Sequence, residues 1–414
     1  MGNHSPEAGH PLGTAGELLA RHQDFSDPYP LLAWLRDNEP VAQAGDMRFV
    51  TRYDDVVTVY RDERFSRARQ AEAEINANTG DIGDDQDLKN ARRAFTSMLI
   101  HMDEPDHRRM RHILEGAFKP SSVVTWLPRV EAITHELIDK VRDKPRFDVL
   151  KDLAFPLPEK VICELMGVPH EDHALWGAWT DTIVRAPRTY APSAEQIAKI
   201  RDAQRNFYHY FRDLVRQRSK NLSDDLVSAL IRAENEGDKL SELEVLGTLQ
   251  LLIMAGHETT ATLVVNGTYL LLKHPDQYRL LREDPELVGA AVEEMLRYES
   301  PSHWSLPREA LVDVPMGDVV IPAGAPVVAA LNSANRDPTR FAQPDQFDIT
   351  RKNNFHIAFA AGPHFCLGNQ LARQEARIMF KAMVTRLPEL HLTEVPELKD
   401  SFVRGYESLV VTQG

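Results

Sequence analysis

The sequence predicts a mainly α-helical protein with a small antiparallel β portion. The first observation is a series of segments with apolar residues at three- and four-residue spacing, which is typical of helices that bury one face. These segments are 106–118, 123–141, 153–166, 194–217, 224–235, 241–273, 286–297 and 371–387. The second observation is that β-rich runs separated by Gly and Asp occur at 39–51 and 312–330, where we expect hairpins. Together they predict a large helical body that carries a small sheet.

Local signals place several boundaries along the chain. The segment Ser241-Glu-Leu-Glu244 reads as a capping box that opens a single long helix over 241–273. Residues 69–98 are polar and irregular, which indicates a long loop of the kind that often covers a binding site. The 414 residues contain no repeat, no Gly/Ser linker and no long charge block. We therefore expect one domain over 20–414 and a flexible N-terminal segment over 1–19.

Composition excludes several classes of function. The net charge of −14, from 48 basic and 62 acidic residues, argues against nucleic acid as a partner. Two cysteines cannot form a disulfide framework, and no apolar leader begins the chain, so we expect a reducing, cytoplasmic location. The apolar stretch 246–272 contains His257, Glu258 and Asn266, which are costly in lipid. It therefore predicts a helix buried in protein, with no membrane span.

Cys366 is the residue with the strongest chemical signal. It lies in Phe359-Ala-Ala-Gly-Pro-His364-Phe-Cys366-Leu-Gly368, directly before a helical pattern. A thiolate at a helix N-terminus is favoured by the helix dipole and by free N–H groups, and glycines let the backbone approach a flat ligand closely. Most free cysteines are small buried hydrophobes, and we keep that interpretation for Cys163. For Cys366 the surrounding residues favour a thiolate that binds iron.

A second candidate site is Ala255-Gly256-His257-Glu258-Thr259-Thr260, in the middle of the longest apolar segment. An acid beside a hydroxyl is costly in an apolar helix unless it has a task. The hydroxyl of Thr259 can donate to a preceding carbonyl and bend the helix, and Gly256 leaves room for a small ligand. Taken alone, the segment is also compatible with a solvated polar stripe.

The Cys366 segment, followed by Leu371-Ala372-Arg373, resembles the haem-binding loop of cytochrome P450 enzymes. The Ala255–Thr260 segment resembles the central-helix motif of the same family, and Glu294-Met-Leu-Arg297 is similar to its Glu-x-x-Arg pair. The three occur in the family's order, and the resemblance spans about residues 20–412. One departure is Ala360, which stands where glycine commonly follows the Phe.

The resemblance implies a cytochrome P450 fold and haem b, iron protoporphyrin IX, with Cys366 as the axial ligand of the iron. His107, Arg111, Arg308 and His364 would contact the haem carboxylates, which suits the geometry of arginine. Further haem contacts are expected from Ala255, Gly256, Phe359 and Gly368. Glu294 and Arg297 would form a buried structural network, with Arg336 as its third member.

The implied activity is that of a soluble, bacterial, actinomycete-like monooxygenase. It would use dioxygen to hydroxylate or epoxidise a bulky apolar molecule, such as a polyketide or a peptide-derived secondary metabolite. Glu258 and Thr259 would be the catalytic residues and deliver protons. The substrate pocket is expected to be formed by Leu252, Ala255, Trp304, Leu306 and Phe402, with His303 and Arg404 as candidate polar anchors.

Electrons would come from NAD(P)H through a separate ferredoxin, or a flavodoxin, and its reductase. A predicted basic patch would receive this acidic partner; it consists of Arg108, Arg109, His112, Arg373 and Arg377. We expect a monomer. Two alternatives remain open at this stage: a haem-thiolate enzyme that catalyses oxidative coupling or another atypical oxidation, and a haem protein that binds ligands without turnover.

Overall fold

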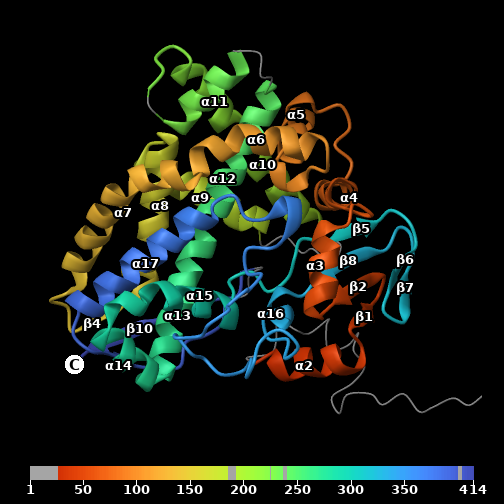
Figure 1. The fold of residues 1–414 in the computed structure, drawn as a ribbon. Coiled ribbons are helices and arrows are strands. Elements are labelled where there is room, and N and C mark those ends of the chain that lie inside the picture. The colour runs from red at the N-terminus through yellow and green to blue at the C-terminus, as the bar shows by residue number, and fades with distance from the viewer. Residues whose placement is uncertain (1–26, 185–192, 224, 236–239, 400–402) are drawn as a thin grey trace, which may run out of the picture.

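Helices make up most of the structure, and the largest of its three described sheets lies along one side of them (Figure 1). The computed structural model describes residues 27–184, 193–223, 225–235, 240–399 and 403–414, so the predicted segment 1–19 lies outside it. The α-helices are α2 (Tyr29–Asn38), α3 (Tyr53–Arg61), α4 (Arg67–Thr79), α5 (Gln86–Thr96), α6 (Asp106–Phe118), α7 (Pro120–Val141), α8 (Pro156–Met166), α9 (His173–Val184), α10 (Ala194–Arg218), α11 (Leu226–Asn235), α12 (Glu242–Gly256), α13 (Glu258–Lys273), α14 (Pro275–Glu283), α15 (Val288–Tyr298), α16 (Leu331–Ala334) and α17 (Asn369–Arg386). Short 3-10 or π turns occur at Leu99–His101, Leu150–Ala154, His170–Asp172, Pro285–Leu287 and Gly362–His364.

Three small sheets complete the described fold. The largest has the order β1-β2-β8-β5-β3, the second β4-β10-β9, and the third is the hairpin β6-β7. Their strands are β1 (Val41–Ala44), β2 (Met47–Val50), β3 (Phe65–Ser66), β4 (Arg146–Asp148), β5 (Arg308–Ala310), β6 (Val314–Met316), β7 (Val319–Ile321), β8 (Pro326–Ala329), β9 (Leu390–Leu392) and β10 (Val410–Gln413). Both predicted hairpins are confirmed, as β1-β2 and β6-β7. The expectation of antiparallel pairing holds for every described ladder except β2-β8, which is parallel.

The centre of the helical body is a close contact between α13, α15 and α17. A side-chain carbon at Gly267 of α13 would lie 2.6 Å from both Met295 of α15 and Phe380 of α17. Real side chains do not approach so closely, so glycine allows the three helices to meet. Their buried residues belong to one large apolar cluster, which also contains Cys163 as the sequence predicted.

The long loop predicted for 69–98 is wrong, because the structure has helices α4 and α5 there. Each helix begins with a side-chain cap: Ser66 accepts from the N–H of Arg69, and Asp85 accepts from the N–H of Leu88. Only a narrow face of each helix is buried, including Ile75 in α4 and Leu88 in α5. The apolar periodicity is therefore too sparse to stand out in so polar a sequence.

The single helix predicted for 241–273 is divided into α12 and α13 at His257, which has φ −114°. The predicted capping box is present, with Ser241 and Glu244 bonding each other's backbone N–H groups. The division places Ala255 and Gly256 at the end of one helix and Glu258 at the start of the next.

The pair Glu294–Arg297 is fully buried, but the predicted third member is wrong. Glu294 accepts hydrogen bonds from Arg297 at 2.8 Å and from Arg351 Nε at 3.0 Å. Arg336 instead donates to the Tyr298 carbonyl at 2.8 Å and lies 3.7 Å above the Tyr298 ring. Both arginines follow Arg297 in sequence, and only the path of the chain after α16 decides which one reaches the carboxylate.

Candidate active site

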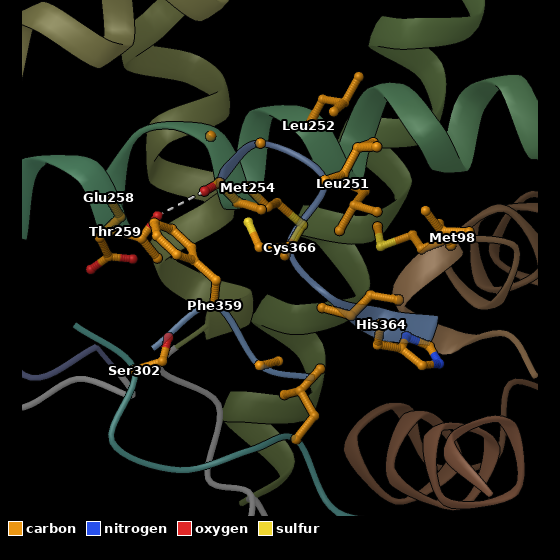
Figure 2. A pocket seen from close by; sticks show the side chains of 18 of the residues that line it. Met98, Leu251, Leu252, Met254, Glu258, Thr259, Ser302, Phe359, His364 and Cys366 are labelled. Atoms are coloured by element: carbon orange, nitrogen blue, oxygen red, sulfur yellow. Dashed lines mark hydrogen bonds between the residues drawn. The ribbon is translucent and has the colours of Figure 1, made fainter. Parts of the chain in front are cut away.

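A cavity of about 450 Å³ lies between the α12–α13 junction and the loop that carries Cys366. Helices α4, α5, α6, α10 and α17 and the segments 301–306 and 358–368 supply much of the remaining wall. In Figure 2 the Cys366 sulfur lies below the α12–α13 ribbon, with Glu258 and Thr259 toward one end of the view and His364 toward the other. The structure thus brings the two sequence motifs, more than 100 residues apart, to one cavity.

The Cys366 loop presents its sulfur to this cavity just before α17. The Cys366 N–H donates to the Phe359 carbonyl at 2.9 Å, which closes the loop. Burial raises the pKa of the Cys366 thiol, and hydrogen bonds from the backbone N–H groups of Gly368 and Asn369 act in the opposite direction. A thiolate at this position would therefore be favoured by a cationic ligand such as iron.

Two residues of the loop have backbone angles in the left-handed region. Gly362 has φ +65°, and a side-chain carbon there would lie 2.8 Å from the Tyr60 carbonyl oxygen, so the close approach requires glycine. Ala360 has φ +64°, a conformation that is costly for a residue with a side chain. The alanine that departs from the family pattern therefore occupies a position with a glycine-like backbone.

Glu258 and Thr259 line the opposite wall, where the helix is interrupted. Thr259 Oγ1 donates to the Ala255 carbonyl at 3.1 Å, drawn as the dashed line in Figure 2. A continuous helix would pair that carbonyl with the N–H of Thr259, so the predicted side-chain bond and bend are both present. Glu258 Oε1 lies 2.5 Å from Lys399 Nζ, which fixes the carboxylate at the edge of the cavity.

Gly256 lines the cavity, and the position of its missing side chain faces Ile162, another residue of the cavity wall. A side-chain carbon there would lie 3.1 Å from Ile162 of α8. The glycine therefore lets α12 pack closely against α8.

The four predicted carboxylate-binding residues, His107, Arg111, Arg308 and His364, line the cavity together. The rings of His107 and His364 are 4.2 Å apart. Neither ring nitrogen of the buried His107 has a hydrogen-bond partner, although Nδ1 lies 3.6 Å from Glu104. Burial and the neighbouring Arg308 lower the pKa of His364 to about 2, so its imidazole is neutral.

These residues fit a haem. The unpartnered nitrogens of His107 and the buried guanidinium of Arg308 need anionic or accepting groups, which two carboxylates supply. Gly368 has open space where a side chain would be, beside the Cys366 sulfur, so a flat ring can approach the loop. Phe359 lines the same wall, and Arg373 lies 4.4 Å above its ring on the other side.

The predicted substrate pocket is found in the same cavity. Leu252, Ala255, Trp304 and Leu306 line it, and Phe402 lies outside the described residues. The two predicted polar anchors are wrong: His303 and Arg404 do not line the cavity and instead pair with Glu299 at 3.0 and 3.2 Å. Much of the remaining wall is apolar and includes Ile75, Phe95, Met98, Ile200, Leu251 and Met254.

Sequence analysis missed several polar residues of the cavity wall. They are Arg67 and Glu74 of α4, His101, Gln204 of α10 and Glu375 of α17. Glu375 is buried, and burial raises the pKa of its carboxyl to about 8. Of these five residues, only Glu375 could have been found from the sequence. It is a charged residue on the apolar face of the helix predicted for 371–387.

The arginines of the predicted basic patch all lie near carboxylates. Arg373 and Arg377 both pair with Glu293, and Arg109 pairs with Glu244. Arg108 lies 3.0 Å from Glu104 but is 80% exposed. The net positive charge on this surface is therefore smaller than the sequence suggests.

The family model and the relatives found by comparison with known proteins agree on one family. The model of the family described as "Cytochrome P450" matches residues 47–405. The chain is 37% identical to the cytochrome P450 monooxygenase PikC of Streptomyces venezuelae, over 95% of this chain and 93% of PikC. It is 35% identical to the polyketide biosynthesis cytochrome P450 PksS of Bacillus subtilis, over 93% and 96% of the two chains.

Solved structures agree with the sequence matches. The cytochrome P450 enzyme CxnD, described as acting in C–S bond formation in chuangxinmycin biosynthesis, is similar with a TM-score of 0.82. It is 34% identical, over 93% of this chain and 94% of CxnD. The fold, the family match and the named monooxygenase relatives agree, and the family implies haem as the cofactor. The chain therefore belongs to the cytochrome P450 family and is a haem-dependent monooxygenase.

Proposed function

We propose that this enzyme uses dioxygen to hydroxylate or epoxidise a bulky, largely apolar secondary metabolite. The observation that carries the proposal is one mainly apolar cavity with the Cys366 sulfur on one wall and the Glu258–Thr259 pair on the other. PksS is named for polyketide biosynthesis, which supports a polyketide or a similar product as the substrate.

Cys366 would hold the iron of the haem through its sulfur, and haem, when bound, would supply the dioxygen-activating chemistry. The N–H groups of Gly368 and Asn369 stabilise negative charge on that sulfur. The two haem carboxylates would be bound by Arg111, Arg308, His107 and His364. These residues line the cavity between the Cys366 loop and α12.

Glu258 and Thr259 manage protons on the substrate side of the cavity. The Thr259 hydroxyl, oriented by its bond to the Ala255 carbonyl, can accept and pass on a proton. Glu258 lies at the edge of the cavity, and Lys399 keeps its carboxylate in place. A proton from solvent can thus pass through Glu258 to the Thr259 side chain without opening the apolar wall.

Electrons come from NAD(P)H through a separate ferredoxin, or a flavodoxin, and its reductase. The exposed Arg108 on α6 and the partly exposed Phe365 beside Cys366 give the partner a cationic and an apolar contact on the sulfur side. No described helix is both long and apolar enough to cross a membrane.

Oxidative coupling is the second candidate, because the printed description of CxnD names bond formation between carbon and sulfur. The two outcomes differ in atom balance. Monooxygenation adds one oxygen atom from dioxygen to the substrate, whereas coupling removes two hydrogens and adds none.

The test uses the haem-loaded protein with NADH, a surrogate ferredoxin and its reductase, and ¹⁸O-labelled dioxygen. A product that gains one labelled oxygen supports the proposal, and a product that loses two hydrogens without label supports coupling. The reduced, carbon monoxide-bound protein should have a strongly red-shifted Soret band that Cys366→His loses. A wild-type protein without that band would overturn the role of Cys366.

A further inference from the structure

Two buried polar oxygens in the cavity wall have no hydrogen-bond partner. They are Oε1 of Glu74 on α4 and Oε1 of Gln204 on α10. Gln204 is 3% exposed, and the Glu74 side chain is 14% exposed. Buried acceptors are rarely left unpaired, so each of these oxygens calls for a donor that enters the cavity.

The haem cannot be that donor for Glu74. Its carboxylates are themselves anionic acceptors, and they account for the unpartnered nitrogens of His107 at the cofactor end. A second carboxylate near Glu74 would be repelled. The free oxygen of Glu74 is therefore left for a ligand other than the cofactor.

Arg67 already balances the charge of Glu74. Its guanidinium donates to Glu74 Oε2 at 2.9 Å and to the Pro307 carbonyl at 2.7 Å, and its side chain is 3% exposed. The ion pair leaves little net charge at this wall, so neither a cation nor an anion is needed for neutrality. The Nε of Arg67 is also without a hydrogen-bond partner, so the pair offers the cavity one donor and one acceptor. A neutral hydroxyl group suits this wall because it can both donate and accept a hydrogen bond.

Packing between α4 and α10 holds the two oxygens on one side of the cavity. Arg201 of α10 donates to the carbonyls of Thr79 and Asp81, both at 2.6 Å, and so ties α10 to the end of α4. Glu74 and Asn78 are one turn apart on α4 and both line the cavity, as do Ile200 and Gln204 on α10. An apolar ligand that lies along Ile75 and Ile200 can thus reach either oxygen with a polar end.

We propose that Glu74, supported by Gln204, is a specificity-determining residue that accepts a hydrogen bond from a hydroxyl group of the substrate. The substrate is then a neutral, hydroxyl-bearing apolar molecule, and its carboxylate analogue is rejected. The inference rests on the proposed function, because it takes the cavity to be the substrate site.

The probes are tetradecan-1-ol and tetradecanoate, which share a chain length and differ in the terminal group. Their dissociation constants are measured from the haem absorbance of the loaded enzyme at pH 8, where the acid is ionised. Wild-type enzyme should bind the alcohol about ten- to a hundredfold more tightly than the acid, because a hydrogen bond to a buried charged group is strong. Equal binding, or a preference for the acid, would overturn the inference and leave water as the partner of Glu74.

The variant Glu74→Gln tests the charge. It keeps the shape of the side chain but leaves the cation of Arg67 without a carboxylate, so the preference should reverse toward tetradecanoate. Glu72→Gln is the matched control, because it makes the same charge change on the exposed face of α4 and should leave both constants unchanged. An unreversed preference in Glu74→Gln would contradict the role of the ion pair.

A third variant protects the test against misfolding. Gln204→Leu should weaken the binding of tetradecan-1-ol several-fold, but the alcohol should still bind more tightly than the acid. An unchanged dissociation constant for the alcohol would show that Gln204 does not take part. The carbon monoxide spectrum of each protein separates the two levels of failure. Loss of the red-shifted band in wild-type enzyme contradicts the proposed function, whereas an intact band with equal binding of both probes contradicts only the role of Glu74.

Discussion

Ala360 carries a side chain at φ +64° in the loop that presents Cys366. The left-handed region costs a residue with a side chain about 1–2 kcal/mol, so strain is held in the loop that carries Cys366. Such strain persists where the surroundings fix the backbone. Here the Ala360 N–H donates to the Ile357 carbonyl at 2.9 Å, and the Cys366–Phe359 bond closes the loop.

We expect Ala360→Gly to stabilise the haem-loaded protein by about 0.5–1 kcal/mol, because relief of the left-handed strain exceeds the entropy that glycine gains on unfolding. The measurement is the midpoint of denaturant unfolding, followed by the haem band. Ala361→Gly is the matched control: its φ is −146°, so glycine relieves nothing there and should destabilise by about 0.5–1 kcal/mol. Equal effects of the two substitutions would show that Ala360 is not strained.

Thr259 is the second residue with a defined geometric role. In Thr259→Ala the hydroxyl that donates to Ala255 is lost, so proton delivery should fail while NADH is still consumed. We expect product per NADH oxidised to fall by a factor on the order of a hundred, the lower end of the range for a positioned acid–base group. Thr259→Ser keeps the hydroxyl and should retain most of the yield. The ratio of product to hydrogen peroxide measures the effect, and an unchanged ratio in the alanine variant would contradict the role.

At the scale of elements, Glu293 of α15 joins α17 to the Cys366 loop. It pairs with Arg373 and Arg377 of α17 and with His356, which precedes the loop. Burial alone would raise the pKa of the Glu293 carboxyl, but hydrogen bonds from His356 and Arg373 outweigh it and lower the pKa to about 2.

A lowered carboxylate pKa gives stability that is present above the unfolded value of about 4.3 and is lost as the pH falls toward about 2. We expect Glu293→Gln to destabilise the protein at pH 7 by about 2 kcal/mol or less, because the group is partly exposed to solvent. The variant should also lose part of the wild-type dependence of unfolding free energy on pH between about 4.5 and 2. Parallel stability curves for the two proteins across that window would contradict the linkage.

At the scale of the whole molecule, the cofactor site couples binding to folding. Arg308 is 6% exposed and His107 is 1% exposed, and burial lowers the pKa of both side chains. Without haem carboxylates these polar groups lack their best partners and weaken the fold. The haem-loaded protein should therefore be the more stable form.

Removal of haem should lower the midpoint temperature of unfolding. Haem added back at a hundred times its dissociation constant should raise the free energy of unfolding by about 2.7 kcal/mol. Differential scanning calorimetry of the loaded and stripped proteins measures this difference. In Arg308→Met the buried cation is absent, so the difference in stability between the haem-loaded and haem-free proteins should become smaller. A gap of the same size in the variant would show that Arg308 does not bind the carboxylates.

Much of the fold could be predicted because its elements carry local signals. The apolar spacing of 106–118 predicted the bounds of α6, and Ser241 with Glu244 predicted the start of α12. The same signals failed where burial is sparse, as in α4 and α5, because a helix that buries a narrow face has little apolar periodicity. The division at His257 was not visible either, since the apolar pattern continues through it.

The sequence by itself determined the family of this enzyme and predicted its chemistry, because the predicted ligand Cys366 and the pair Glu258–Thr259 each lie in a short segment whose neighbours shape them. Only the tertiary structure decided that Arg351 rather than Arg336 reaches Glu294, and that Gly256 makes room for Ile162. The structure alone also placed Arg67, Glu74 and Gln204 on one cavity. The physical reason is that such contacts join residues far apart in the chain, and their partners are fixed by how the helices pack rather than by local spacing.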